Sequence, residues 1–85
     1  AVTLAEEIAM ARRYLAIEQV RFGERLRLEW DLDPAAERAL LPPLLLQPLV
    51  ENAVKHGVEP SDAGATVRIS CRRRGSVVHQ LRRPR

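Results

Sequence analysis

The sequence has few aromatic residues, a single cysteine and no long apolar run, and each shortage excludes a class of protein. It contains one Trp, one Tyr and one Phe among 85 residues, so its core must be built from aliphatic side chains. Cys71 is the only cysteine, so an intrachain disulfide is excluded and no cysteine-based metal site is indicated. No stretch reaches the ~18 apolar residues that a membrane span requires, and the N-terminus has no signal-peptide pattern. We therefore expect one small cytoplasmic domain, or a piece of a larger one.

Acidic residues are absent after Asp62, and their absence makes the charge uneven along the chain. The formal net charge is +3, but six arginines lie between Arg72 and Arg85, and the first 71 residues carry 8 basic against 11 acidic groups. Nucleic-acid-binding proteins usually carry their basic groups on a folded face or along a helix. Here they lie at a chain end, where disorder concentrates. We expect no nucleic-acid partner, and a nucleic-acid binder with a basic tail remains an alternative.

Residues 4–22 have the pattern of an amphipathic helix. Thr3 and Glu6 form a capping box before the first apolar residue, and Gly23 is suited to end the helix. The apolar stripe consists of Leu4, Ile8, Ala11, Leu15 and Phe22, widened by Met10, Tyr14 and Ile17. The opposite face, which we expect to be solvated, carries Glu6, Glu7, Arg12, Arg13 and Gln19.

After this helix the apolar period changes to two. In LRLEWDL, residues 26–32, apolar and charged residues alternate as in a half-buried strand. TVRISCR, residues 66–72, alternates again, and SVVHQL, residues 76–81, is expected to return as a third strand. The second of these strands places Val67, Ile69 and Cys71 on one face. Asp33-Pro34 opens one connecting loop, and EPSDAGA, residues 59–65, forms another.

A second helix is expected from about Pro43 to His56, with Gly57 as its left-handed cap. Pro48 fits poorly beyond the first turn of such a helix, because it lacks an amide donor. The alternative is a start near Gln47, which places Pro48 at the first position. The expected apolar stripe consists of Leu46, Leu49, Val50 and Ala53.

The same helix carries four polar residues of different chemistry within six positions. Asn52, Lys55 and His56 are three or four residues apart, and Glu51 precedes Lys55 by one turn, so all four share one side of the helix. Carboxylate and amide oxygens suit Mg²⁺, and a lysine suits phosphate. The residues alone favour an ordinary surface ion pair between Glu51 and Lys55 over such a site.

The stretch LQPLVENAVKHG, residues 46–57, resembles the N-box of bacterial sensor histidine kinases, whose ATPase superfamily includes gyrase, Hsp90 and MutL. Within this superfamily, residues 14–57 resemble the LytS-like kinases in particular. In that family a helix that ends in a Tyr-Leu and Arg-Phe pattern is followed by a strand, a proline-containing segment and the N-box. A related chaperone or mismatch-repair ATPase agrees less well, because those proteins lack the segment before the strand. The matching residues are Tyr14, Leu15, Arg21, Phe22, Pro42, Leu46, Gln47, Pro48, Leu49, Glu51, Asn52, Ala53, Lys55, His56 and Gly57.

The resemblance implies an α/β (α+β) fold, part of a two-layer ATPase sandwich in the order helix-strand-helix-strand-strand. Residues 1–23 would be the end of the dimerisation and phosphoacceptor helical region. Residues 24–81 would form the N-terminal part of the ATPase domain, and residues 82–85 a basic tail.

In such a domain ATP lies between the N-box helix and a flexible lid. Asn52 would then contact Mg²⁺, Lys55 would lie near a phosphate, and His56 would line the nucleotide or the lid edge. Glu51 would be the catalytic residue, polarising a metal-bound water or assisting the phosphoacceptor.

The resemblance further implies ATP-dependent protein-histidine phosphorylation in a two-component system, with a response regulator as partner. It is compatible with a homodimer and with membrane anchoring through an upstream region. His56 and His79 are the only histidines and neither matches the phosphoacceptor, and no Asp-x-Gly-x-Gly box follows. We expect a fragment ended by truncation or frameshift and inactive alone. The alternatives are a non-catalytic module that binds a partner through its first helix, and a tail that is solvated or binds acidic surfaces.

Overall fold

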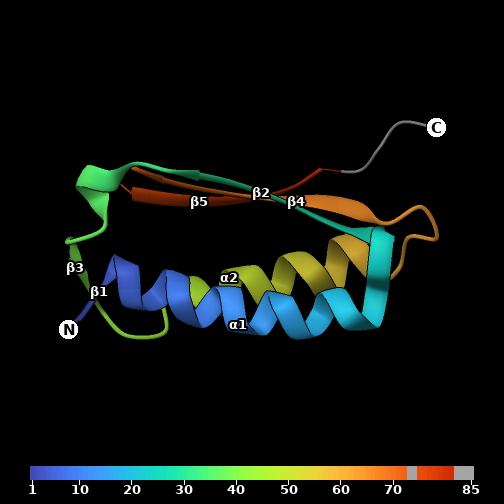
Figure 1. Ribbon diagram of the computed structural model, residues 1–85, viewed down its shortest axis with the longest axis horizontal. Helices are drawn as coiled ribbons and strands as arrows, with labels where there is room; N and C mark the ends of the chain where they lie inside the picture. Colours follow the sequence, from blue (N-terminus) through green and yellow to red (C-terminus); the bar gives the residue numbers. More distant parts are fainter. Residues whose placement is uncertain (73–74, 82–85) are drawn as a thin grey trace.

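A computed structural model describes residues 1–72 and, for the backbone alone, residues 75–81. Two helices lie side by side and cover one face of a three-stranded sheet (Figure 1). This mixture of helix and strand confirms the expected α+β class. In chain order the elements are β1 Val2–Thr3, α1 Leu4–Phe22, η1 Gly23–Arg25, β2 Leu26–Leu32, η2 Pro34–Ala36, β3 Leu40–Leu41, α2 Leu46–Ala53, η3 Val54–Val58, β4 Ala65–Arg72 and β5 Gly75–Leu81.

The sheet has the strand order β2-β4-β5, with β2 parallel to β4 and β4 antiparallel to β5. The register pairs Leu26 with Ala65 and Leu32 with Cys71. Parallel neighbours need a long crossover connection, and α2 with η3 supplies it between β2 and β4. β5 is the return strand that the alternation predicted. The expected turn at residues 73–74 and the basic tail at residues 82–85 lie outside the described residues.

The core lies between the helices and the sheet. The predicted stripe of α1 is buried, and so is the predicted face of β4. Because the register of β2 and β4 aligns their apolar positions, both strands present one apolar face to the helices. The buried residues of these elements are Leu4, Ile8, Ala11, Leu15 and Phe22 in α1, Leu26 in β2, and Ala65, Val67, Ile69 and Cys71 in β4.

Two predictions for α1 are wrong. Ile17 does not widen the apolar stripe, since its side chain is 69 % exposed. It follows buried Leu15 by two residues, which is about 200° around a helix, and therefore faces away from the core. Glu7 does not lie on the solvated face, since it is only 1 % exposed. It points instead toward the chain segment that leads into α2.

The start of α1 is tied to the segment before α2 by a short ladder that the sequence did not indicate. β1 pairs with β3 in antiparallel fashion, with Val2 opposite Leu41. Next to this ladder, the amide of Leu4 donates to the carbonyl of Ala39 at 2.9 Å. The capping box is confirmed, because the Glu6 amide donates to the Thr3 hydroxyl oxygen and the Thr3 amide donates to the Glu6 carboxylate. These contacts leave little freedom at this end of the helix.

Two glycines with positive φ allow a matched test of the packing around η1. Gly64 has φ +76, and a Cβ there would lie 2.0 Å from the carbonyl oxygen of Arg25. Gly23 has φ +58, but a Cβ there would meet nothing within 4 Å. Gly23→Ala should lower the free energy of unfolding by about 1–3 kcal/mol through its backbone conformation alone. Gly64→Ala should lower it further, because the backbone must also move. Urea denaturation of both variants measures the difference, and equal losses would contradict the close approach of residues 25 and 64.

Candidate functional site

α2 begins at Leu46, one residue before the later of the two predicted starts. Pro48 is therefore its third residue. It lies within the first turn, where amides have no partner inside the helix, so the proline costs no helical hydrogen bond. Leu45 occupies the N-cap position but makes no side-chain cap. The amides at this helix start must find acceptors elsewhere.

Glu7 of α1 supplies those acceptors. Its Oε1 accepts hydrogen bonds from the amides of Leu45 at 2.7 Å and Leu46 at 3.0 Å, and its Oε2 accepts from the amide of Leu44 at 3.3 Å. Leu44 has φ 60, a left-handed conformation that non-glycine residues rarely adopt. A single carboxylate, almost completely buried, thus holds both the helix start and the turn before it.

The other end of α2 differs from the prediction. The helix continues into η3, a π-helical turn in which the amide of Glu59 donates to the carbonyl of Val54 at 3.0 Å. The predicted left-handed cap at Gly57 is wrong, because among the described residues positive φ occurs at Gly23, Gly64 and Leu44. The chain does not reverse at Gly57, since Val58 continues the turn and is completely buried.

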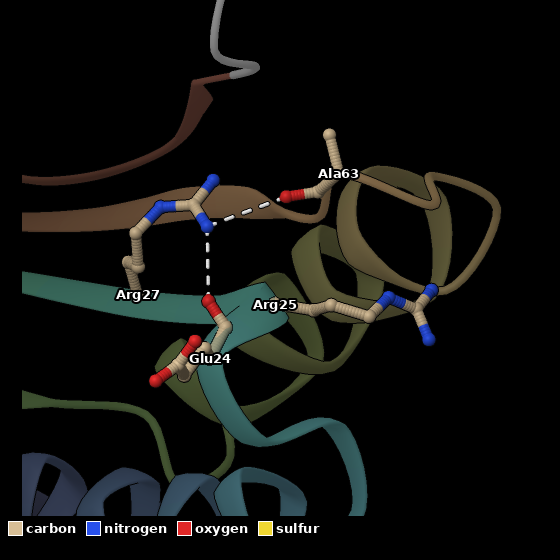
Figure 2. A pocket seen from close by; sticks show the side chains of 4 residues that line it. All are labelled: Glu24, Arg25, Arg27 and Ala63. Carbon is tan, nitrogen blue, oxygen red and sulfur yellow. Dashed lines mark hydrogen bonds between the residues drawn. The ribbon is translucent and has the colours of Figure 1, made fainter.

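Arg25 closes this second end. Its Nη2 donates to the carbonyls of Val58 at 3.1 Å, Glu59 at 3.2 Å and Ser61 at 2.8 Å, and its Nε donates to Ser61 at 3.1 Å. Figure 2 shows the Arg25 side chain reaching from the start of β2 toward this turn, away from Arg27. The guanidinium therefore adds a charged donor to the carbonyls of Val58 and Ser61, which also accept from the amides of Ser61 and Gly64.

The four predicted site residues all lie on the solvent side of this helix. Glu51 and Asn52 are exposed on α2, and Lys55 and His56 are exposed in η3. The opposite side is buried against α1 and the sheet, and it includes Leu46, Val50, Ala53, Val54, Gly57 and Val58. The structure thus brings the predicted polar residues to one continuous surface, as the spacing indicated.

Leu49 does not belong to the apolar stripe as predicted, because it is 46 % exposed. The buried side of the helix runs on through Val54 and Val58, which turns Leu49 toward the side that carries Asn52. Leu45, one turn earlier, is 52 % exposed. Exposed leucines therefore lie beside the polar residues on the surface of α2, and the sequence pattern did not predict this arrangement.

Tyr14 connects α1 with the polar surface. Partial burial raises the pKa of its phenol, and the nearby carboxylates of Glu18 and Glu51 raise this pKa further. Arg21 lies in the same region, with Nη1 3.5 Å from a Glu18 carboxylate oxygen and Nη2 3.7 Å from one of Glu59. The carboxylate of Glu51 is therefore close to α1, at the border of the exposed surface.

A pocket of about 510 Å³ lies at the start of β2, lined by Glu24, Arg25, Arg27 and Ala63 (Figure 2). Arg27 Nη1 donates to the carbonyls of Glu24 at 2.9 Å and Ala63 at 3.3 Å. None of the four predicted site residues lines this pocket. Both arginines donate to backbone carbonyls, and Nη2 of Arg27 is buried without a hydrogen-bond partner among the described residues.

Within residues 1–72, no set of three or more His, Cys, Asp or Glu side chains is arranged to hold a metal ion. In the same part of the chain, no helix has the length and apolar character needed to cross a membrane.

No protein-family model matches the chain, but individual curated proteins do. It is 39 % identical over 72 residues to the sensor histidine kinase YesM of Bacillus subtilis, covering 85 % of this chain and 12 % of YesM. It is 43 % identical over 74 residues to the sensor histidine kinase BtsS of Escherichia coli, covering 87 % of this chain and 13 % of BtsS. It is 42 % identical over 55 residues to the sensor protein LytS of Staphylococcus haemolyticus, covering 65 % of this chain and 9 % of LytS. The chain therefore spans only 9 to 13 % of these three relatives.

The position of Glu51 can be tested through the single tyrosine. The absorbance of phenolate reports Tyr14 alone, and its titration midpoint should lie above the ordinary value of 10.0. Glu51→Gln should lower the midpoint, because it removes a nearby negative charge, whereas Glu29→Gln on β2 should leave it unchanged. Since the folded chain holds this proton more tightly than the unfolded chain, the free energy of unfolding should fall as pH rises through 10. A midpoint insensitive to Glu51→Gln would contradict the placement of Glu51 beside α1.

Proposed function

Because the chain belongs to the LytS-like sensor histidine kinases and matches one segment of them, we propose that it supplies the N-box side of an ATP site. The observation that carries the proposal is the common exposure of Asn52, Lys55 and His56 on the side of α2 and η3 that faces away from the core.

The residues present fit a magnesium–nucleotide complex. Mg²⁺ usually takes one or two protein oxygens and completes its six ligands with phosphate oxygens and water. Asn52 offers an amide oxygen and Glu51 a carboxylate, and both are exposed. A dedicated cluster of several acidic side chains is not needed for this mode of binding.

Each polar residue has a role in the proposed site. When bound, the magnesium–ATP complex supplies the phosphoryl group together with the charge that neutralises it. Asn52 holds the metal, and Lys55 places a positive charge beside a phosphate. His56 lines the nucleotide or the edge of a lid. With the complex bound, Glu51 would supply a carboxylate that polarises a water molecule or assists the acceptor of the phosphoryl group.

In the longer protein, this site would serve ATP-dependent phosphorylation of a histidine, with a response regulator as the next acceptor in a two-component system. The sheet and its helical layer would be part of an ATPase sandwich formed by residues 24–81. Residues 1–23 would join that sandwich to a dimerisation region. The support for these assignments is the match to named sensor histidine kinases over most of this chain.

A second candidate function is partner binding through α1 without catalysis. Ile17 is 69 % exposed and Val20 is 89 % exposed, one turn apart on the outer side of this helix. Such a surface favours association with another helix. An oligomer that depends on these residues and does not respond to Mg-ATP would support this candidate over the first.

The proposed site can be tested by NMR titration of the chain with Mg-ATP. We expect shifts confined to residues 51–56 and binding no tighter than roughly millimolar, about −4 kcal/mol. Excess EDTA should reduce the shifts, because the metal joins Asn52 to the phosphates. Asn52→Ala should abolish them, and Arg13→Ala, at an exposed position of α1, should not. Shifts that survive Asn52→Ala, or that map outside α2 and η3, would refute the assignment.

A further inference from the structure

We propose that Glu7 and Arg25 are positioning residues, which hold the two ends of the nucleotide-binding helix and thereby set its polar surface relative to α1. The inference rests on the proposed function of that surface, and it adds which residues fix the position of the helix that carries the surface. Neither residue belongs to the surface itself, and both come from α1 or the turn that follows it.

The hydrogen bonds between Glu7 and the start of α2 are short. Hydrogen bonds of 2.7 and 3.0 Å from the amides of Leu45 and Leu46 converge on one carboxylate oxygen of Glu7. Bonds to an ionised acceptor are shorter and stronger than bonds between neutral groups. Of the four amide positions at this helix start, Pro48 has no donor, so Glu7 serves two of the remaining three.

Burial of the Glu7 carboxylate would be costly without this arrangement. A charge removed from water destabilises the fold unless it is hydrogen-bonded or paired. Among the described residues no lysine or arginine forms an ion pair with Glu7. Its compensation comes from three amides and from the positive ends of two helices, because Glu7 also lies in the first turn of α1. The hydrogen bonds that compensate the buried Glu7 carboxylate therefore form only when the start of α2 lies in this position.

Arg25 makes the complementary contact at the other end. Three carbonyls after the last helical turn accept from its guanidinium, at distances of 2.8 to 3.2 Å. A cation is favoured at a helix C-terminus and an anion at an N-terminus, so each residue has the charge that its helix end prefers. Because α1 and η1 carry both contacts, a displacement of α1 moves both ends of α2 and η3 together.

The polar surface follows from these two contacts. Asn52 lies between them along the helix, and Lys55 and His56 lie in η3, close to the end that Arg25 holds. Loss of one contact should therefore disturb the surface locally, with the sheet unaffected. A residue that only stabilises the fold would lower the stability of all elements equally, and this difference separates the two roles.

The test uses amide hydrogen exchange of the chain without nucleotide, with Glu7→Gln and Arg25→Gln as variants. Glu7→Gln should speed exchange at Leu45 and Leu46 at least tenfold, because a neutral amide oxygen is a weaker acceptor than a carboxylate and the new NH2 group would face the Leu44 amide donor. The resonances of Asn52 should shift, and the protection of β4 should stay the same. Arg25→Gln should give the corresponding local change at Lys55, His56 and residues 58–61. Glu29→Gln, at an exposed position of β2, and Arg13→Gln, at an exposed position of α1, are the matched controls.

Protection that falls equally in α2 and β4, or that does not change, would overturn the proposal. If Glu7→Gln does not fold, Glu7→Asp keeps the charge and loses reach, so the same local pattern at residues 44–46 is required of it. Mg-ATP titration of the same variants is a separate readout. Failure of the wild-type chain to bind would refute the proposed function, while the exchange pattern would still decide whether Glu7 and Arg25 position the helix.

Discussion

The structure depends on a match of charge between one helix and its neighbours. α2 and η3 present amides at one end and carbonyls at the other; Glu7 binds the amides in place of a side-chain cap, and Arg25 adds a charged donor to carbonyls that local backbone amides also bind. Because an anion meets the N-terminus and a cation the C-terminus, the helix dipole is complemented at both ends. The helix is thereby joined to α1 as one unit over the sheet, as Figure 1 shows for the helical layer.

This arrangement explains why the outer side of the helix is available. Glu7 and Arg25 bind the two ends of the helix from α1 and η1, and Glu51, Asn52, Lys55 and His56 all remain exposed on its outer side. The buried side is filled by small aliphatic residues, which pack close to the sheet and α1. Exposed Leu45 and Leu49 add an apolar border next to Asn52. A nucleotide, with an apolar base and charged phosphates, has the corresponding division of chemistry.

Local patterns in the sequence predicted the main elements, the apolar faces of α1 and β4, the capping box and the shared side of the four polar residues. Glu7 was assigned to the solvated face because its acceptor role depends on amides 37 to 39 residues away, which no local pattern records. Arg25 was missed for the same reason, since its carbonyl partners lie 33 to 36 residues away. The cap at Gly57 failed because burial of Val58 continues the turn past the glycine. One feature of the sequence could have indicated the role of Glu7. The segment before α2 consists of leucines and prolines, and a helix start without a capping residue needs a hydrogen-bond acceptor from another part of the chain.

The chain is similar to sensor histidine kinases over most of its own length, and the two end contacts give a physical reason for the placement of its helix. The most direct measurement is the NMR scalar coupling across the hydrogen bond between the Leu45 amide nitrogen and the Glu7 side-chain carboxyl carbon. The account predicts an observable coupling, because the 2.7 Å bond is short and buried. Absence of this coupling in the folded chain, with the Glu7 carboxylate open to solvent, would contradict it.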